Sequence, residues 1–240
     1  MGPPRGAGTS RSYRDPAVLT LIVTIAIAVD AVLSLVGAVS TLSEIGLLER
    51  MREGGDWSME EAEANDLRQA LIGFTQLGVF VATAVLFLVW VHRVVSNAST
   101  FRRLPMTPGW AVGSYFVPIV NFWKPLTAMR EAWWAGAPER SGPGARISRG
   151  TPAVLGCWWA SWLVSCVLGQ VVFRLALRAE QLDELLLSSR LSLASDLWDV
   201  PLALAALAVV HGIVKRHREA EAAVPVAPAT PAGPEGPLPA

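Results

Sequence analysis

Residues Gly109–Pro125 read GWAVGSYFVPIVNFWKP, and the path of this stretch decides how many times the chain crosses a membrane. The stretch is apolar enough to enter a bilayer, but it has only 17 residues, whereas a spanning helix needs about 20. Proline lacks a backbone donor and disfavours helical geometry in the preceding residue. Pro118 should therefore break the chain at Val117, and Pro125 should start a new helix. We expect a re-entrant or interfacial hairpin rather than a fifth span.

The residues after the second proline have the pattern of an amphipathic helix. Apolar residues recur at intervals of three and four from Leu126 to Trp133, while Arg130 and Glu131 fall on the opposite side. Such helices lie flat in the headgroup layer of a membrane. We predict a surface helix here, so that the whole segment 109–135 stays at one face of the membrane.

Long apolar runs lie on both sides of this segment. Hydrophobic residues make up 52% of the 240 residues and charged residues 17%, a balance that favours a membrane protein over a water-soluble domain. Four runs, at residues 17–43, 67–95, 153–175 and 193–214, are long enough to cross a hydrocarbon core of about 30 Å. The sequence therefore predicts an all-α integral membrane bundle of four spanning helices, plus the Pro-broken segment and the surface helix.

The two ends of the chain carry little that a core would bury. We predict a membrane domain at residues 17–218, between a disordered basic tail at 1–16 and a disordered Pro/Ala-rich tail at 219–240. The first apolar run is longer than the roughly 7–15 residues of a signal-peptide core, so we expect it to be kept as a membrane anchor.

The loop after the first span is acidic and contains a helix-start signal. Ser58 and Glu61 have the spacing of a capping box, in which each side chain satisfies a free amide proton at a helix start. We expect the second helix to begin near Met59, outside the bilayer.

The distribution of basic residues indicates the orientation. Lysines and arginines near span ends are retained on the cytoplasmic side. Under the four-span topology, 14 of the 20 basic residues share one side with both chain ends. We predict a multi-pass protein of the plasma membrane with both termini cytoplasmic. Eight of the ten tryptophans fall at the same side, as expected for a one-sided interfacial belt.

The run LPMTPGWAVGSYFVPIVNFWKPLTAMREAWWAG, residues 104–136, resembles the signature of a known family. That family is an uncharacterised bacterial membrane family, common in actinobacteria, named domain of unknown function 4328. The positions that carry the resemblance are Pro108, Gly109, Trp110, Phe116, Pro118, Asn121, Pro125, Arg130, Glu131 and Trp133. The similarity extends from about Val18 to Lys215. It implies a multi-span membrane protein and no particular activity.

Asp30 lies in the middle of the first span, where an aspartate costs roughly 2.5–3.5 kcal/mol on insertion scales. It should therefore face protein rather than lipid. Two interpretations are open: a proton or cation site, or a protonated or salt-bridged packing residue that orients the helix.

Two further acids, Asp196 and Asp199, share one face near the start of the last predicted span. With Ser195 they have the composition that a helix N-terminus favours, so we interpret them as capping residues. Arg174, at the end of the third span, is a plausible partner for either.

The sequence offers little for metal or catalytic chemistry. Cys157 and Cys166 are nine residues apart in one apolar run, too far to pair with each other, and we expect them to pack as small apolar side chains. We find no zinc motif and no nucleophile motif, so we expect no metal, no cofactor and no enzymatic activity. The zero net charge gives no reason to expect nucleic acid as a partner.

Two functions are consistent with these features. The first is a structural or interaction module that docks the lipid bilayer, a membrane-protein partner or another copy of itself at its cytoplasmic face. Its candidate motif is Gly109, Trp110, Phe116, Pro118, Asn121, Pro125, Arg130 and Glu131. The alternative is a small oligomeric transporter or ion pathway that uses Asp30 and the broken segment around Asn121.

Overall fold

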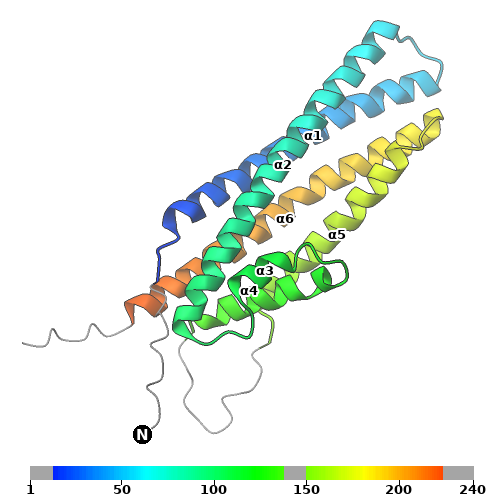
Figure 1. The fold of residues 1–240 in the computed structure, drawn as a ribbon. Helices are drawn as coiled ribbons and strands as arrows, with labels where there is room; N and C mark the ends of the chain where they lie inside the picture. Colours follow the sequence, from blue (N-terminus) through cyan, green and yellow to red (C-terminus); the bar gives the residue numbers. More distant parts are fainter. Residues whose placement is uncertain (1–12, 138–149, 224–240) are drawn as a thin grey trace, which may run out of the picture.

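The structure is a computed structural model that describes residues 13–137 and 150–223. Four long helices form an elongated bundle in this part of the chain (Figure 1). They are α1 (Ala17–Arg52), α2 (Met59–Phe101), α5 (Ala153–Ala176) and α6 (Leu182–Ala222). Each is long and apolar enough to cross a membrane. The predicted all-α bundle with four spanning helices is confirmed, while residues 1–12 and 224–240 of the predicted tails lie outside the described residues.

All four helices are longer than the predicted spans, although α5 exceeds its span by only one residue. The 43 residues of α2 extend roughly 65 Å at about 1.5 Å per residue, twice the thickness of a hydrocarbon core of about 30 Å. Its start is as predicted, because the Ser58 hydroxyl accepts a hydrogen bond from the Glu61 amide at 3.1 Å. At the other end of the chain α6 continues to Ala222, a few residues past the predicted membrane domain.

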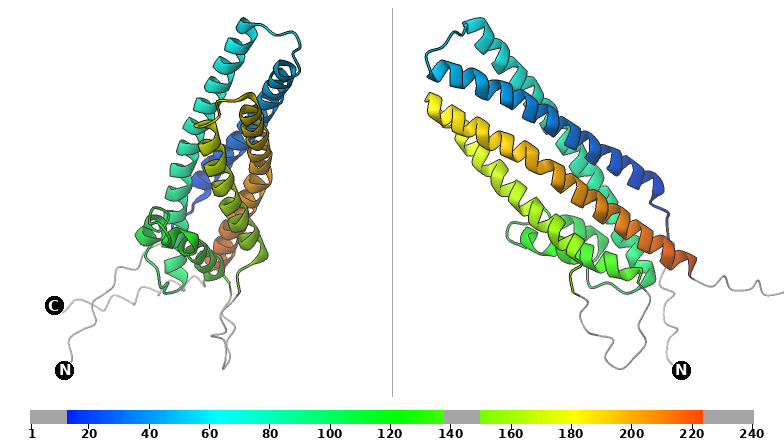
Figure 2. Two further views of the ribbon diagram at one scale, coloured as in Figure 1. Left: turned by 90° about the vertical axis from the view of Figure 1, so that its right-hand side faces the viewer. Right: turned by 180° about the vertical axis from the view of Figure 1, so that it is seen from behind.

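Helix α1 packs between α2 and α6, and α5 packs on the other side of α6. The described chain ends meet at one end of the bundle, which we call the terminal end (Figures 1 and 2). There Arg218 forms an ion pair with Asp15 at 3.3 Å, and the Asn97 amide donates to the carbonyl of Arg14 at 2.8 Å. Both ends of the described chain therefore lie at the same side of the bundle.

The opposite end, which we call the loop end, carries the α1–α2 and α5–α6 connections. Three exposed ion pairs tie the helices together there. They join Arg50 to Glu61, Arg52 to Asp183 at 3.8 Å, and Arg190 to Glu49 at 2.8 Å.

Residues Gly109–Pro125 do not cross the bundle. They form the short helix α3 (Pro108–Gly113) and the 3-10 turn η1 (Val120–Phe122), which are followed by α4 (Lys124–Ala135). All three lie beside α2 and α5 at the terminal end (Figures 1 and 2). The prolines and the basic residues that follow therefore predicted the right number of spans.

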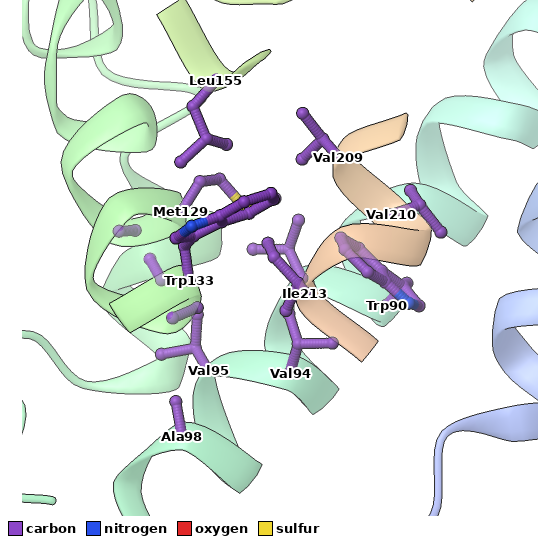
Figure 3. Close-up of a cluster of buried hydrophobic side chains, with 14 of the residues drawn as sticks. Trp90, Val94, Val95, Ala98, Met129, Trp133, Leu155, Val209, Val210 and Ile213 are labelled. Carbon is purple, nitrogen blue, oxygen red and sulfur yellow. The ribbon is translucent and has the colours of Figure 1, made fainter. Parts of the chain in front are cut away.

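The buried core is concentrated at the terminal end, where α4 packs on the long helices. In Figure 3, Met129 and Trp133 of α4 face Ile213 and Val209 of α6 and Leu155 of α5. The predicted amphipathic helix is present, but its apolar face contacts protein rather than lipid.

The tryptophans gather at the terminal end, as the sequence indicated, but several of them point inward. Trp90, Trp133, Trp158 and Trp159 are buried in the core. Indole rings contribute strongly to a core, because each ring buries a large apolar area. The interpretation of the eight as an interfacial belt was wrong for these four.

Candidate functional site

The motif segment begins with a well-capped turn of helix. The hydroxyl of Thr107 accepts a hydrogen bond from the Trp110 amide at 3.2 Å, and Pro108 occupies the first turn of α3, where its missing donor is not needed. Ala111 is fully buried against the core. Gly109 is exposed, with open space around it.

The chain reverses at Ile119, whose backbone φ of 69° and ψ of −54° lie in a strained region. The amide of Val120 donates to the carbonyl of Pro118 at 2.8 Å, which closes a γ-turn of the rarer kind. Ile119 is the single non-glycine residue with positive φ in residues 13–137 and 150–223. The regular helix has already ended at Gly113, and the sharp reversal follows Pro118, at Ile119 and not at the predicted Val117.

Residues 108–123, which we call the hairpin, expose an unusual amount of apolar surface. The relative exposures are 47% for Trp110, 71% for Phe116, 69% for Ile119, 63% for Phe122 and 48% for Trp123. Several large apolar side chains exposed within one short segment indicate an interaction site or a membrane contact.

The base of the hairpin is attached to α5. The indole N–H of Trp159 donates to the carbonyl of Phe122 at 3.0 Å. Two polar atoms inside the hairpin, the Tyr115 hydroxyl and the Asn121 amide oxygen, are buried and have no hydrogen-bond partner in the described chain. Burial raises the pKa of the Tyr115 phenol well above its usual value. The Asn121 amide oxygen therefore accepts no hydrogen bond from the described chain.

Arg130 and Glu131 of the motif are half-buried and form part of a charged group. Glu131 accepts a hydrogen bond from Arg102 at 3.0 Å and lies 3.8 Å from the Arg130 guanidinium. These contacts connect α4 to the end of α2. Pro125 is buried in the first turn of α4.

The buried side of α4 docks against α6 through Trp133. A Cβ atom at Gly212 would lie 2.5 Å from the Trp133 ring, so only glycine permits this approach. The guanidinium of Arg216 covers the same ring at 4.4 Å from its centroid, a cation–π geometry.

His217 of α6 also belongs to this contact. It lies beyond the predicted span end at Val214, is fully buried, and its Nε2–H donates to the carbonyl of Ala132 at 2.8 Å. Burial lowers the pKa of His217, although the hydrogen bond to Ala132 opposes the shift.

A second group of polar residues lies in the middle of the bundle, around Asp199. The hydroxyl of Ser165 on α5 donates to its Oδ1 at 3.1 Å, and the hydroxyl of Ser34 on α1 donates to its Oδ2 at 3.3 Å. Asp199 thus joins three helices.

Asp196, one turn earlier on α6, contacts α2. The amide of Gln76 donates to Asp196 Oδ1 and to the carbonyl of Leu33, each at 3.3 Å. The space for these groups exists because α1 has Gly37 here, where a Cβ would lie 2.5 Å from the Gln76 nitrogen.

Asp30 of α1 is half-buried and lies near the same group. Its carboxyl lies near the Thr83 hydroxyl of α2 and near the Asp199 carboxyl. All four spanning helices thus contribute to what we call the polar cluster: Asp30, Ser34, Gln76, Thr83, Ser165, Asp196 and Asp199.

The interpretation of Asp196 and Asp199 as capping residues was wrong. Helix α6 begins at Leu182, where Gln181 and Glu184 form a capping box, so both aspartates lie well inside the helix. The Gln181–Glu184 spacing was the signal in the sequence that would have placed the helix start correctly. Arg174 forms no ion pair with either aspartate in the described part of the chain.

The comparison with protein families agrees with this architecture. The sequence model described as "Domain of unknown function (DUF4328)" matches residues 53–215. The chain belongs to the DUF4328 family. The DUF4328 match includes the hairpin, α4, Asp196 and Asp199, whereas Asp30 and Ser34 lie before it. No curated protein and no solved structure shows significant similarity to this DUF4328 chain.

Proposed function

We propose that this DUF4328 protein is a membrane-embedded interaction module that docks its hairpin into the lipid headgroup layer at the terminal end of the bundle. The observation that carries the proposal is the exposed apolar surface of the hairpin. Its role is to bind and position rather than to catalyse.

The hairpin surface has no covering within the described chain. Removing an exposed side chain such as Phe116 from water is worth roughly 1.5–3 kcal/mol, and the hairpin exposes several of this size. The strained turn at Ile119 supports the same conclusion, since strained backbone is found where a residue serves a contact rather than the fold. The turn directs the Ile119 side chain outward, where its exposed surface adds nothing to the stability of the fold.

The position and charge of the hairpin favour lipid as the occupant. It lies beside α2 and α5, whose exposed apolar surfaces themselves require lipid. Exposed Arg102 and Arg103 follow α2 directly, and Lys124 begins α4. Basic residues next to an apolar surface attract anionic headgroups.

The test measures the surroundings of Ile119. In a background with Cys157→Ser and Cys166→Ser, Ile119→Cys is labelled with a polarity-sensitive fluorophore and reconstituted into vesicles of phosphatidylcholine and phosphatidylglycerol. Docking predicts blue-shifted emission that lipid-borne quenchers reduce and iodide does not. The matched control is Asp56→Cys, in the exposed loop-end connection.

Two results would overturn the proposal. In the first, iodide quenches the label at position 119 as strongly as the label at 56. In the second, shielding appears only when another protein is present, which would replace lipid with a protein partner.

One observation favours transport as a second candidate function. The polar cluster joins all four spanning helices inside the bundle, as a site for a small ion would require. Measuring flux into vesicles with the wild type and with Asp30→Asn tests this candidate, and equal flux in both would exclude a pathway through Asp30.

A further inference from the structure

Helix α5 lies at one edge of the bundle, where it packs on α6 (Figure 2). The side of α5 that faces α6 is marked by Ser165, whose hydroxyl donates to Asp199. Leu168 and Val172 fall on the same side and are partly buried. Residues 166, 167, 169, 170, 173 and 174 are all exposed. The outer side of α5 therefore has no covering within the described chain.

The outer side of α5 carries one glutamine, Gln170. It follows Ser165 by five residues, which places the two about 140° apart around the helix. The Gln170 amide is exposed and makes no hydrogen bond within residues 13–137 and 150–223. The glutamines of α2 behave differently, because Gln69 and Gln76 are both hydrogen-bonded to other helices. Gln170 is thus an amide whose bonding groups are all unused.

Gln170 lies at the depth of the hydrocarbon core. The 24 residues of α5 extend about 36 Å, so a core of about 30 Å centred on the helix leaves about 3 Å at each end. Gln170 precedes the end of α5 at Ala176 by six residues, or about 9 Å, and so lies about 6 Å inside such a core. Lipid chains offer an amide no hydrogen-bond partner, whereas glutamines in membranes bond across helices. The depth of Gln170 therefore favours protein as the occupant of this side.

The residues around Gln170 have the spacing of a contact between two helices. Exposed or partly buried side chains recur at intervals of three, four and three residues, which are the a and d positions of a heptad. A polar residue at one a position fixes the register and the number of helices. Gly169, beside Gln170, has open space around it, so a second backbone can approach closely. We call these residues the α5 stripe: Leu163, Cys166, Gln170 and Phe173.

A second copy of the chain matches the α5 stripe. Copies of one membrane protein share one orientation, so two α5 helices related by a two-fold axis along the membrane normal run parallel, and equal positions meet at the axis. A side-chain amide is both a donor and an acceptor, so two Gln170 side chains can bond each other. The contact begins one turn beyond Trp159, which the hairpin already covers at the terminal end.

We infer that α5 is a homodimerisation helix, in which the Gln170 amides of two copies bond each other inside the membrane. The inference rests on the outer side of α5 and not on the exposed side chains of the hairpin. Dimerisation and lipid docking of the hairpin are therefore tested separately.

Oxidative cross-linking of the native cysteines tests the inference. Cys157 and Cys166 are both exposed, and their separation of nine residues, about 2.5 helical turns, places them on opposite sides of α5. The full-length protein is oxidised with copper phenanthroline in vesicles of phosphatidylcholine and phosphatidylglycerol. Cys157→Ser keeps the cysteine of the α5 stripe and should give a covalent dimer. The matched variant Cys166→Ser should remain monomeric.

Gln170→Leu, made in the Cys157→Ser background, tests the amide itself. The protein is diluted with lipid until only a minority of the parent is cross-linked, so that the cross-linked fraction follows the association constant. This fraction should fall by roughly three- to tenfold in Gln170→Leu, because the bonds between the amides are lost. Val171→Leu, on the same helix but outside the α5 stripe, should leave the fraction unchanged.

Three results would each overturn the inference. Equal cross-linking through Cys157 and Cys166 would show random collision rather than a defined contact. The absence of a dimer in Cys157→Ser at every protein-to-lipid ratio would show that lipid or another protein covers the α5 stripe. Neither comparison depends on how the Gln170 variant folds. An unchanged cross-linked fraction in Gln170→Leu would show that the amides do not hold the two copies together.

Discussion

Replacing Gly212 by alanine should weaken the packing of α4 on the bundle, because the Trp133 ring of α4 packs against α6 at this glycine. The new Cβ would lie 2.5 Å from Cζ3 and 2.7 Å from Cη2 of the ring, whereas ordinary contact begins at 3.4 Å. The ring is buried and covered by Arg216, so α4 itself must move. Overpacking of this kind costs about 1–3 kcal/mol, partly offset by up to about 1 kcal/mol of helix propensity.

The matched control is Gly73→Ala in α2, where a Cβ would meet nothing within 4 Å and only the propensity gain applies. The free energy of unfolding in mixed micelles of dodecyl maltoside and dodecyl sulfate, followed by tryptophan fluorescence, compares the two. We expect Gly212→Ala to be the less stable by about 1–3 kcal/mol. Adding Trp133→Phe, which has a smaller ring, should recover part of the loss. Equal stability of the two alanine variants would refute the docking of α4 through Trp133.

Further predictions concern the turn, the polar cluster and the buried histidine. Ile119→Gly should raise the free energy of unfolding in detergent by about 1 kcal/mol, since glycine adopts positive φ without strain, and an unchanged value would argue against the γ-turn. Gly37→Ala should lower thermal stability because its Cβ would meet the Gln76 amide at 2.5 Å; no loss relative to Gly73→Ala would contradict this packing. Burial lowers the pKa of His217 in the folded state, so its contribution is present above about pH 6.5 and lost as the pH falls below that value. The melting temperature of wild type should therefore fall more steeply on acidification than that of His217→Gln, and parallel curves would count against it.

Local chemistry was enough to predict the outline of the fold. The lengths of the apolar runs gave the four spans, Pro118 and Pro125 gave the interruption, and Ser58 gave the start of α2. Each of these signals lies within a few residues of the feature that it determines. These signals do not depend on which helices pack against one another.

The features that were missed depend on contacts between distant residues. The spacing from Leu126 to Trp133 shows that one side of α4 is apolar, but not whether lipid or protein covers that side. His217 lies in a basic run typical of a surface, and its burial follows only from the position of Ala132. The polar cluster required the register of four helices, and the misplaced start of α6 concealed it.

The two ends of the bundle are held together by different forces. Three exposed ion pairs join the helices at the loop end, where dissolved salt weakens them. The terminal end has exposed ion pairs as well, but it also has the apolar core around Trp133, which salt affects little. A rise in ionic strength should therefore weaken the contacts of α1 with α2 and α6 at the loop end. A harsh detergent should instead disrupt the apolar core at the terminal end. The tryptophan-rich core is thus the part of the bundle whose packing depends least on dissolved salt.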